Sequence, residues 1–214
     1  APRNKSERMI VNNYNAMRFI KEHSNDKLSP DMIREIHSLI SHDTLDDTKY
    51  EGMFRDDNSI AVRDAFTGET YHDPPNFNRI PDLIKALCDF ANDDSVFVHP
   101  IVKGIVLHFV LAYIHPFMDG NGRVSRSLFY WYLMRNGYAS VEYISISKVM
   151  KSHRGKYDNA YLLSETDGND ITYFINYNLD MIFKAADAFL SYIRRKIEEL
   201  SLIHISEPTR HLRI

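Results

Sequence analysis

Cysteine is almost absent from this sequence, and long apolar runs are absent altogether. The single cysteine, Cys88, cannot form an internal disulfide, which favours a reducing compartment. The longest apolar stretch, residues 105–114, is interrupted by His108 and is far shorter than the roughly 20 residues that span a bilayer. The sequence also carries no secretory signal pattern. We therefore expect a cytoplasmic protein with no membrane contact.

Neither sign of charge dominates. The formal net charge is −3 at pH 7, which gives no general electrostatic reason to expect nucleic acid as the main partner. Hydrophobic residues make up 44% of the chain and charged residues 26%, the composition of an ordinary globular protein. At 214 residues the chain is most simply one domain with a substantial core.

Helical periodicity accounts for most of the chain, and Ser29-Pro30 is a typical helix start. Residues 59–72 differ, because apolar residues alternate there around a glycine-containing turn and end at two prolines, which predicts a short β-hairpin. The fold class is therefore all-α with one small hairpin. The predicted helices cover residues 9–22, 31–40, 79–92, 99–114, 126–137, 145–165 and 170–199.

The two ends of the chain do not look native. Residues 200–210 resemble the translation of a transposase adapter used in sequencing libraries. We therefore expect residues 1–199 to form the domain and residues 200–214 to be a non-native tail. Because the chain starts at Ala1 and enters helical sequence almost at once, we also expect an upstream segment to be missing.

The most informative motif is HPFMDGNGRVSR, residues 115–126, which lies between two apolar helices. It contains two of the eight glycines, Gly120 and Gly122, which let backbone N–H groups approach a ligand closely. A helix beginning near Arg123 adds unpaired N–H groups and a partial positive charge. Arg123 and Arg126 share one face of that helix. The motif therefore predicts a phosphate-binding cradle, although no Gly-Lys-Ser/Thr is present to make it a P-loop.

The same motif supplies two further chemical groups. Asp119 stands beside the cradle, where a carboxylate and a polyphosphate would need a bridging cation such as Mg²⁺. His115 precedes the loop, and an imidazole is suited to take a proton from an attacking hydroxyl. Together these residues predict a nucleotide site with Asp119 as metal ligand and His115 as general base.

The motif resembles the signature of Fic-domain proteins, His-Pro-Phe-x-Asp/Glu-Gly-Asn-Gly-Arg-x-x-Arg, and matches it at every defined position. The resemblance, which includes segments typical of bacterial members, extends over roughly residues 9–199. It implies the Fic fold, a helical bundle around a central helix–loop–helix motif. The implied core is about residues 50–180, with the active-site loop at 115–126 and the hairpin at 59–72 as the family's "flap". It also implies Mg²⁺-dependent transfer of AMP from ATP to a Ser, Thr or Tyr hydroxyl of a protein.

The resemblance also assigns roles to individual residues. It makes His115 the catalytic base, places Phe117 in the core and directs Arg126 to the γ-phosphate. The protein target would bind along the flap by adding a strand to it. The last flap residues, from Glu69 onward, would lie over the nucleotide. The expected nucleotide-binding residues are Asp119, Gly120, Asn121, Gly122, Arg123, Arg126, Thr70, Tyr71, His72, Tyr157 and Tyr161.

Two of these assignments have an equally weighted structural alternative. Tyr157 and Tyr161 lie one helical turn apart and either line the adenine pocket or belong to ordinary core packing. For His108, on the apolar helix before the motif, we expect a hydrogen-bonded core position rather than a catalytic one. The modified residue and the target protein are not identified by the sequence.

Regulation and competing functions also follow from the resemblance. Many Fic proteins carry an inhibitory helix with the pattern Ser/Thr-x-x-x-Glu-Gly/Asn, whose glutamate pairs with the second motif arginine. Glu51-Gly52 comes closest here, but Asp47 occupies the Ser/Thr position. The candidate partners are therefore an inhibitory helix in cis on a missing N-terminal segment, an antitoxin in trans and a second copy of the chain.

Three other functions remain open at this point. The first is phosphotransfer as in the related Doc toxins, which tend to carry lysine where this chain has Gly122. De-AMPylation at the same site is the second, an activity that normally relies on the inhibitory glutamate. The third is a toxin–antitoxin type of interaction module without essential catalysis, against which the intact His115 argues.

Overall fold

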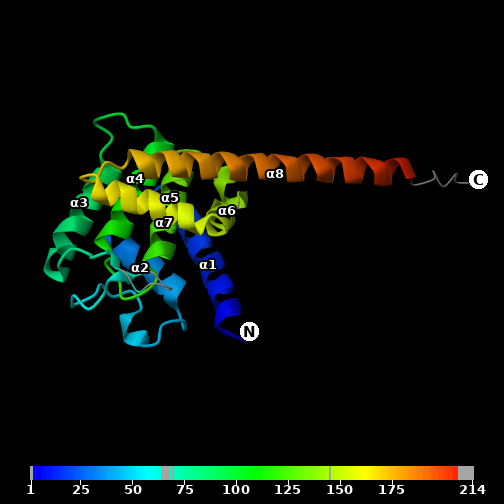
Figure 1. Ribbon diagram of the computed structural model, residues 1–214. Helices are drawn as coiled ribbons and strands as arrows, with labels where there is room; N and C mark the ends of the chain where they lie inside the picture. The colour runs from blue at the N-terminus through cyan, green and yellow to red at the C-terminus, as the bar shows by residue number, and fades with distance from the viewer. Residues whose placement is uncertain (1, 64–67, 69, 145, 207–214) are drawn as a thin grey trace, which may run out of the picture.

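The computed structural model describes residues 2–63, 68, 70–144 and 146–206. Helices make up nearly all of its regular structure, so the predicted all-α class is confirmed (Figure 1). The α-helices are α1 (Lys5–Glu22), α2 (Pro30–Ser41), α3 (Ile80–Asn92), α4 (Pro100–Ile114), α5 (Asn121–Arg135), α6 (Ile146–Ser152), α7 (Arg154–Thr166) and α8 (Thr172–Ser206). Short 3₁₀ turns lie at η1 (Thr48–Tyr50), η2 (Phe77–Arg79) and η3 (Ala139–Tyr143).

Helices α4 and α5 form the centre of the bundle and pack against each other. Helices α1 and α2 cover α5, whereas α3 and α8 pack on α4. Helix α4 is apolar around most of its circumference because it is surrounded in this way. The central pair contributes several fully buried side chains to the core, including Trp131, Leu107 and Leu111. The loop that joins α4 to α5, residues 115–120, together with the first turn of α5 makes up the 115–126 motif, so this motif is held by two buried helices.

Most helix ends lie where local signals predict them. The Ser29 hydroxyl accepts a hydrogen bond from the N–H of Met32, and Pro30 is the first residue of α2. After α5, Gly137 adopts a left-handed conformation with φ +87°. The predicted helix over 145–165 is wrong in one respect, because it is divided into α6 and α7 at His153. The Val149 carbonyl accepts from the Ser152 hydroxyl and contacts the His153 ring, and such local bonds compete with helix continuation.

The flap region contains two short antiparallel strands, β1 (Val62–Arg63) and β2 (Thr70–His72). Val62 lies opposite His72, and Arg63 lies opposite Thr70. The predicted hairpin is therefore present, with strands shorter than the 59–72 range. Of its turn, residues 64–67 and 69 lie outside the described part of the chain.

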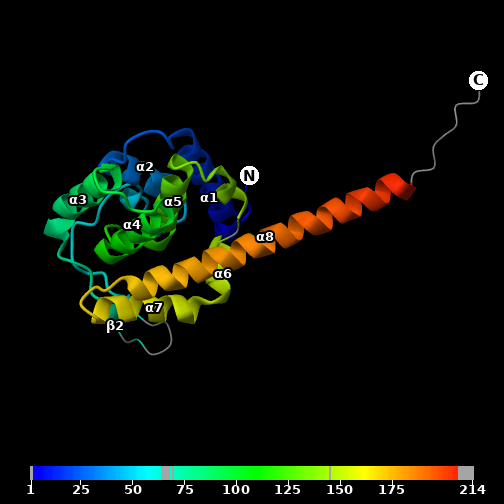
Figure 2. The ribbon, with the colours of Figure 1, turned by 90° about the horizontal axis from the view of Figure 1, so that it is seen from above.

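Helix α8 is the longest element, with 35 residues. Its first half packs on α4, α6 and α7, and its second half projects away from the bundle (Figures 1 and 2). The helix continues past residue 199 as far as Ser206, into the segment expected to be adapter-derived. In the part of the chain that the structure describes, no helix has the length and apolarity to cross a membrane.

Candidate active site

The loop begins with a strained residue. His115 caps the C-terminus of α4 with φ 48° and ψ 56°, a left-handed conformation that costs a non-glycine residue of order 1–3 kcal/mol. Two hydrogen bonds hold it there. Its N–H donates to the Leu111 carbonyl at 3.0 Å, and Nε of Arg55 donates to its carbonyl at 2.9 Å. The chain therefore turns sharply out of α4 at the predicted catalytic histidine.

The hydrogen bonding of the His115 ring defines its tautomer. Nδ1 lies 3.1 Å from the Ala112 carbonyl. Because a carbonyl can only accept, Nδ1 carries the proton and Nε2 keeps a free lone pair. Burial lowers the pKa of His115 to about 4, with the Ala112 carbonyl opposing this shift and the nearby His72 and Arg55 adding to it. The ring is therefore neutral near pH 7, and Nε2 can accept a proton.

The predicted phosphate cradle corresponds to the N-terminus of α5. This helix begins at Asn121, two residues before the predicted start near Arg123, and Gly120 precedes it with φ +85°. The first N–H groups, of Asn121 and Gly122, have no carbonyl one turn before them. A Cβ on Gly122 would lie 3.3 Å from Nη1 of Arg126. The absence of side chains on these glycines thus leaves room around the N–H groups, as an anion site requires.

The side chain of Asn121 points inward, away from the cradle. Its Oδ1 accepts from the Phe117 N–H at 2.9 Å, and its Nδ2 donates to the Phe117 carbonyl at 2.7 Å. The Phe117 ring is completely buried. These contacts close the loop onto the core, so only the backbone N–H of Asn121 is available to an anion.

The two arginines have different surroundings. Nη1 of Arg123 donates to the Ile40 carbonyl at the end of α2 at 2.9 Å, and Nη2 lies 3.7 Å from Oδ2 of Asp119. Around Arg126, by contrast, no carboxylate of the described residues lies within 4.0 Å. Both arginines line a cavity of about 320 Å³. Its other lining residues are Asn13, Met17, Ser127, Tyr130, Glu142, Ile144, Ser147 and Lys148.

Asp119 fits the predicted role of metal ligand. Its carboxylate is two-thirds exposed, and Oδ1 accepts from the Gly120 N–H at 2.5 Å. Mg²⁺ is typically held by one or two carboxylates together with substrate phosphates. A single exposed carboxylate beside the predicted phosphate cradle would supply the protein's part of that donor set.

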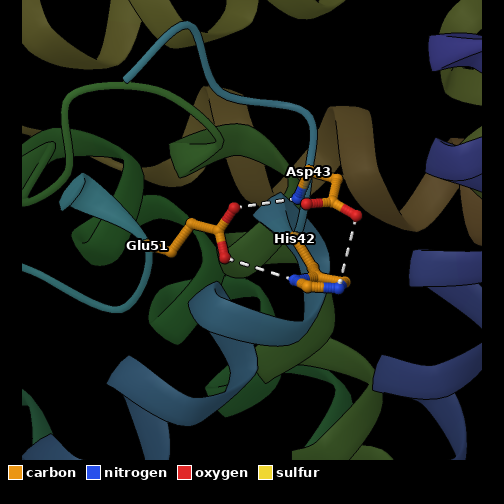
Figure 3. A group of neighbouring side chains, drawn as sticks. All are labelled: His42, Asp43 and Glu51. Atoms are coloured by element: carbon orange, nitrogen blue, oxygen red, sulfur yellow. Dashed lines mark hydrogen bonds and ion pairs between the residues drawn. The ribbon is translucent and has the colours of Figure 1, made fainter. Parts of the chain in front are cut away.

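One other group, His42, Asp43 and Glu51, has ligand-type side chains close together (Figure 3). The imidazole Nδ1 lies 3.3 Å from Oε2 of Glu51, and Nε2 lies 3.5 Å from Oδ2 of Asp43. Oε1 of Glu51 also accepts from the Asp43 N–H. Each of the two ring nitrogens therefore faces a different carboxylate of the group. The group is accounted for as an exposed cluster of ion pairs, and we assign no metal to it.

His37, which the sequence interpretation missed, connects α2 to the loop. Its ring is fully buried and stacks on Phe117 with a centroid distance of 3.8 Å and an interplanar angle of 2°. Nδ1 accepts from the Gly52 N–H at 2.9 Å, so Nε2 carries the proton and donates to the Asp119 carbonyl at 2.9 Å. Burial lowers its pKa. The sequence did carry one signal for this residue, because His37 lies on the apolar face of α2 that Ile33, Ile36 and Ile40 form, which indicates a buried histidine.

Arg55 is a second missed residue. Its backbone N–H donates to the Pro116 carbonyl at 2.8 Å, in addition to the Nε bond to His115. Nη1 donates to the Asp57 carbonyl at 2.7 Å, and Nη2 to the Pro75 carbonyl. The side chain is buried, and it joins the active-site loop to both segments that flank the flap. A single arginine in a polar loop gave no sequence signal for this role.

A model of the Fic/DOC family matches residues 27–133, half of the chain, including α2, the flap, α4 and the whole loop. The chain belongs to the Fic/DOC family. Its relatives named "Protein adenylyltransferase Fic" include those of Aedes aegypti and Drosophila willistoni, 35% and 34% identical over 120 residues. These matches cover 56% of this chain and only 22% of each relative's length. Because these relatives are insect proteins, the expected bacterial origin is not confirmed.

Solved structures confirm the Fic fold. A Fic family protein from Desulfovibrio desulfuricans G20 matches with a TM-score of 0.76 at 21% identity, over 90% of this chain and 55% of that one. Fic-1 from C. elegans matches with a TM-score of 0.66 at 20% identity, over 92% and 55% of the two chains. The predicted bundle around a helix–loop–helix motif is thus confirmed.

In this Fic domain the base of the flap is fixed by His72. The His72 side chain is buried, its Nε2 donates to the Tyr113 carbonyl at 2.7 Å, and its Nδ1 lies 2.6 Å from Oε1 of Glu165. Its ring centroid is 6.3 Å from that of His115. Both ring nitrogens are therefore engaged by α4 and α7. Thr70 is exposed on β2, whereas the side chain of Tyr71 and all of Glu69 lie outside the described residues.

The predicted adenine-pocket tyrosines lie in an aromatic layer between α4, α7 and α8. The Tyr157 ring stacks on the His108 ring, and its hydroxyl oxygen lies 3.3 Å from Nε2 of His108. The Tyr161 ring packs on Phe109 and Phe174. Burial raises the pKa of Tyr157 to about 12 and lowers that of His108 to about 3. These contacts match the core-packing alternative, and the adenine role stays a prediction. The buried Tyr161 hydroxyl has no hydrogen-bond partner among the described residues.

Proposed function

We propose that this chain is a protein adenylyltransferase, which transfers AMP from ATP to a Ser, Thr or Tyr hydroxyl of a protein. The observation that carries the proposal is the neutral His115, with its Nε2 lone pair, at the start of the short loop that leads into the N–H groups of α5. The name of the insect relatives supports the same activity.

In the proposed reaction the target hydroxyl attacks the α-phosphorus of ATP while its proton passes to Nε2 of His115. The bond from the α-phosphorus to the bridging oxygen breaks, and pyrophosphate leaves. The N–H groups of Asn121 and Gly122, with Arg123 and Arg126, stabilise the negative charge on the phosphates. Mg²⁺ held at Asp119 would offset further phosphate charge. The left-handed turn at His115, where the chain leaves α4, would fix the position of the base.

The target is proposed to bind along the flap. The two described strands form a sheet of only two members, so backbone groups at its edges are available to pair with an extended segment. Main-chain pairing of this kind would position a hydroxyl near His115, because His72, the last residue of β2, has its ring centroid 6.3 Å from that of His115. It also places few demands on the target's side chains.

Doc-like phosphotransfer, a second candidate, is distinguished by which phosphorus is transferred. We expect label to reach a protein target from α-³²P-ATP and not from γ-³²P-ATP, with pyrophosphate released. Incubation of the purified chain with a host lysate and each nucleotide, followed by gel autoradiography, makes the measurement. Transfer only from the γ position would instead establish phosphotransfer, and transfer from neither would favour an interaction module.

We further propose that a glutamate outside this chain, on an inhibitory helix in cis or an antitoxin in trans, pairs with Arg126. Arg126 has no carboxylate within 4.0 Å among the described residues, and it shares its cavity with Asn13 and Met17 of α1. The same helix exposes 69% of Ile10 and 66% of Tyr14, apolar surface that a neighbouring helix would cover.

This regulation predicts that the chain is less inhibited than a longer form that carries such an inhibitory helix in cis. The rate of auto-AMPylation from α-³²P-ATP, measured for both forms at equal concentration, is expected to be higher for the shorter chain. Equal rates would contradict the proposal.

A further inference from the structure

Helix α8 carries two apolar stripes on opposite sides. One stripe, which includes Phe174, Met181 and Ala185, is buried against the bundle. The other, here called the outer stripe, faces away from it. Its exposed members include Phe183 at 74% and Ile197 at 62%. The outer stripe consists of Leu179, Phe183, Ala186, Leu190, Ile193 and Ile197, followed by Leu200.

The spacing of the outer stripe is that of a coiled-coil seam. Its residues alternate at intervals of four and three, so that Phe183, Leu190 and Ile197 occupy a positions and the intervening residues occupy d positions of a heptad. Three successive heptads follow this rule. Residues 179–197 of the stripe also lie within the part of the chain that we expect to be native.

Among the described residues, the helices that contact α8 are α4, α6 and α7, and none of them accompanies its projecting half. Beyond its contacts with α6 the helix extends away from the bundle (Figure 2). Helices in proteins gain most of their stability from packing an apolar face, and an isolated helix is marginal in water. We therefore expect a second helix to pack against the exposed heptad seam of this segment.

Charges beside the stripe indicate which helix that is. In an antiparallel pair of α8 helices with Leu190 facing Ile193 of the second copy, e positions of the two helices adjoin each other. Asp187 then lies beside Arg194 of the second copy, and the two-fold symmetry repeats this pair. In a parallel pair the residues beside Asp187 and Arg194 would be Ile182 and Phe189, which offer no opposite charge. The antiparallel arrangement also places the two bundles at opposite ends.

We propose that the outer stripe of α8 forms an antiparallel coiled coil with α8 of a second copy of this chain. The interface uses neither the active-site loop nor the flap, so both sites of the dimer stay accessible. The proposal does not depend on the reaction that the site catalyses.

Charge reversal within the full chain tests both the contact and its direction. We expect wild-type protein to sediment as a dimer. Asp187→Arg or Arg194→Asp alone should raise the dimer dissociation constant at least about tenfold, because each places like charges in both symmetric positions. The double reversal should restore the wild-type constant, and Leu190→Glu should abolish the dimer. Arg195→Glu, which alters an exposed charge away from the stripe, is the matched control.

Sedimentation equilibrium over a range of concentrations gives these constants, and circular dichroism verifies that each variant is folded. A wild-type monomer at every concentration would overturn the proposal. A dimer that survives Leu190→Glu would also overturn it, as would a double reversal no tighter than the single variants.

Discussion

His115→Ala is expected to lower the rate of AMP transfer by about 100- to 10,000-fold, the usual contribution of a general base. The variant removes the Nε2 lone pair that would accept the proton of the target hydroxyl. The proposed phosphate cradle belongs to α5, so ATP should bind with an affinity close to that of the parent. Single-turnover transfer from α-³²P-ATP and a separate ATP-binding titration measure the two properties independently.

His99→Ala is the matched control for this variant, since His99 is an exposed histidine at the opposite end of α4. It should leave transfer unchanged. If labelling by His115→Ala persists at the parent rate, His115 is not the base. A loss of ATP binding equal to the loss of transfer would show that the histidine mainly supports the nucleotide site.

The pH dependence of the parent gives a second readout of the same residue. A base is active in its unprotonated form, which is present above its pKa and lost as the pH falls through it. Because burial lowers the pKa of His115 to about 4, kcat/KM should stay flat from pH 8 to about 5.5 and fall only near pH 4. A fall in kcat/KM near pH 6.5, the pKa of an unburied histidine, would contradict this expectation if no variant of another histidine removes that fall.

His37→Ala is expected to have the second-largest effect, although His37 touches no proposed substrate. It leaves the Gly52 N–H and the Asp119 carbonyl without their buried partner and removes the ring stacked on Phe117. A loss of about 2–4 kcal/mol in the free energy of unfolding follows from the cavity and the unpaired groups. Transfer should also fall about 10- to 100-fold at temperatures where the variant is folded, because the loop loses its support.

Two conservative variants separate positioning from general stability. In His37→Gln the amide nitrogen can replace Nε2 and still donate to the Asp119 carbonyl. In His37→Asn the amide oxygen can replace Nδ1 and still accept from Gly52, but the bond to the loop is lost. If His37 positions the loop, the Gln variant should retain more activity than the Asn variant.

Unfolding by denaturant and single-turnover transfer, measured on both variants, make the comparison. His42→Ala, an exposed histidine at the end of the same helix, is the control and should affect neither property. Equal activity of the Gln and Asn variants would assign His37 a structural role only.

Local chemistry determined much of this protein from sequence alone. Residues 115–126 are contiguous, and a helix N-terminus with small residues offers N–H groups to an anion whatever the surrounding fold, so the loop could be interpreted without a fold. The helix start at Ser29 and the stop at Gly137 depend on backbone groups within one turn, and both were predicted. The periodicity of each helix likewise needs no knowledge of its neighbours.

Only the tertiary structure decided which groups support the loop. His37 and Arg55 lie 82 and 60 residues from the loop groups that they bond, and no local pattern relates such distant positions. The same holds for His72, whose partner Glu165 is 93 residues away. For α8, spacing alone indicated an apolar helix. The fold covers one of its stripes and leaves the other exposed, because burial depends on which elements pack against a face, and periodicity carries no information about that.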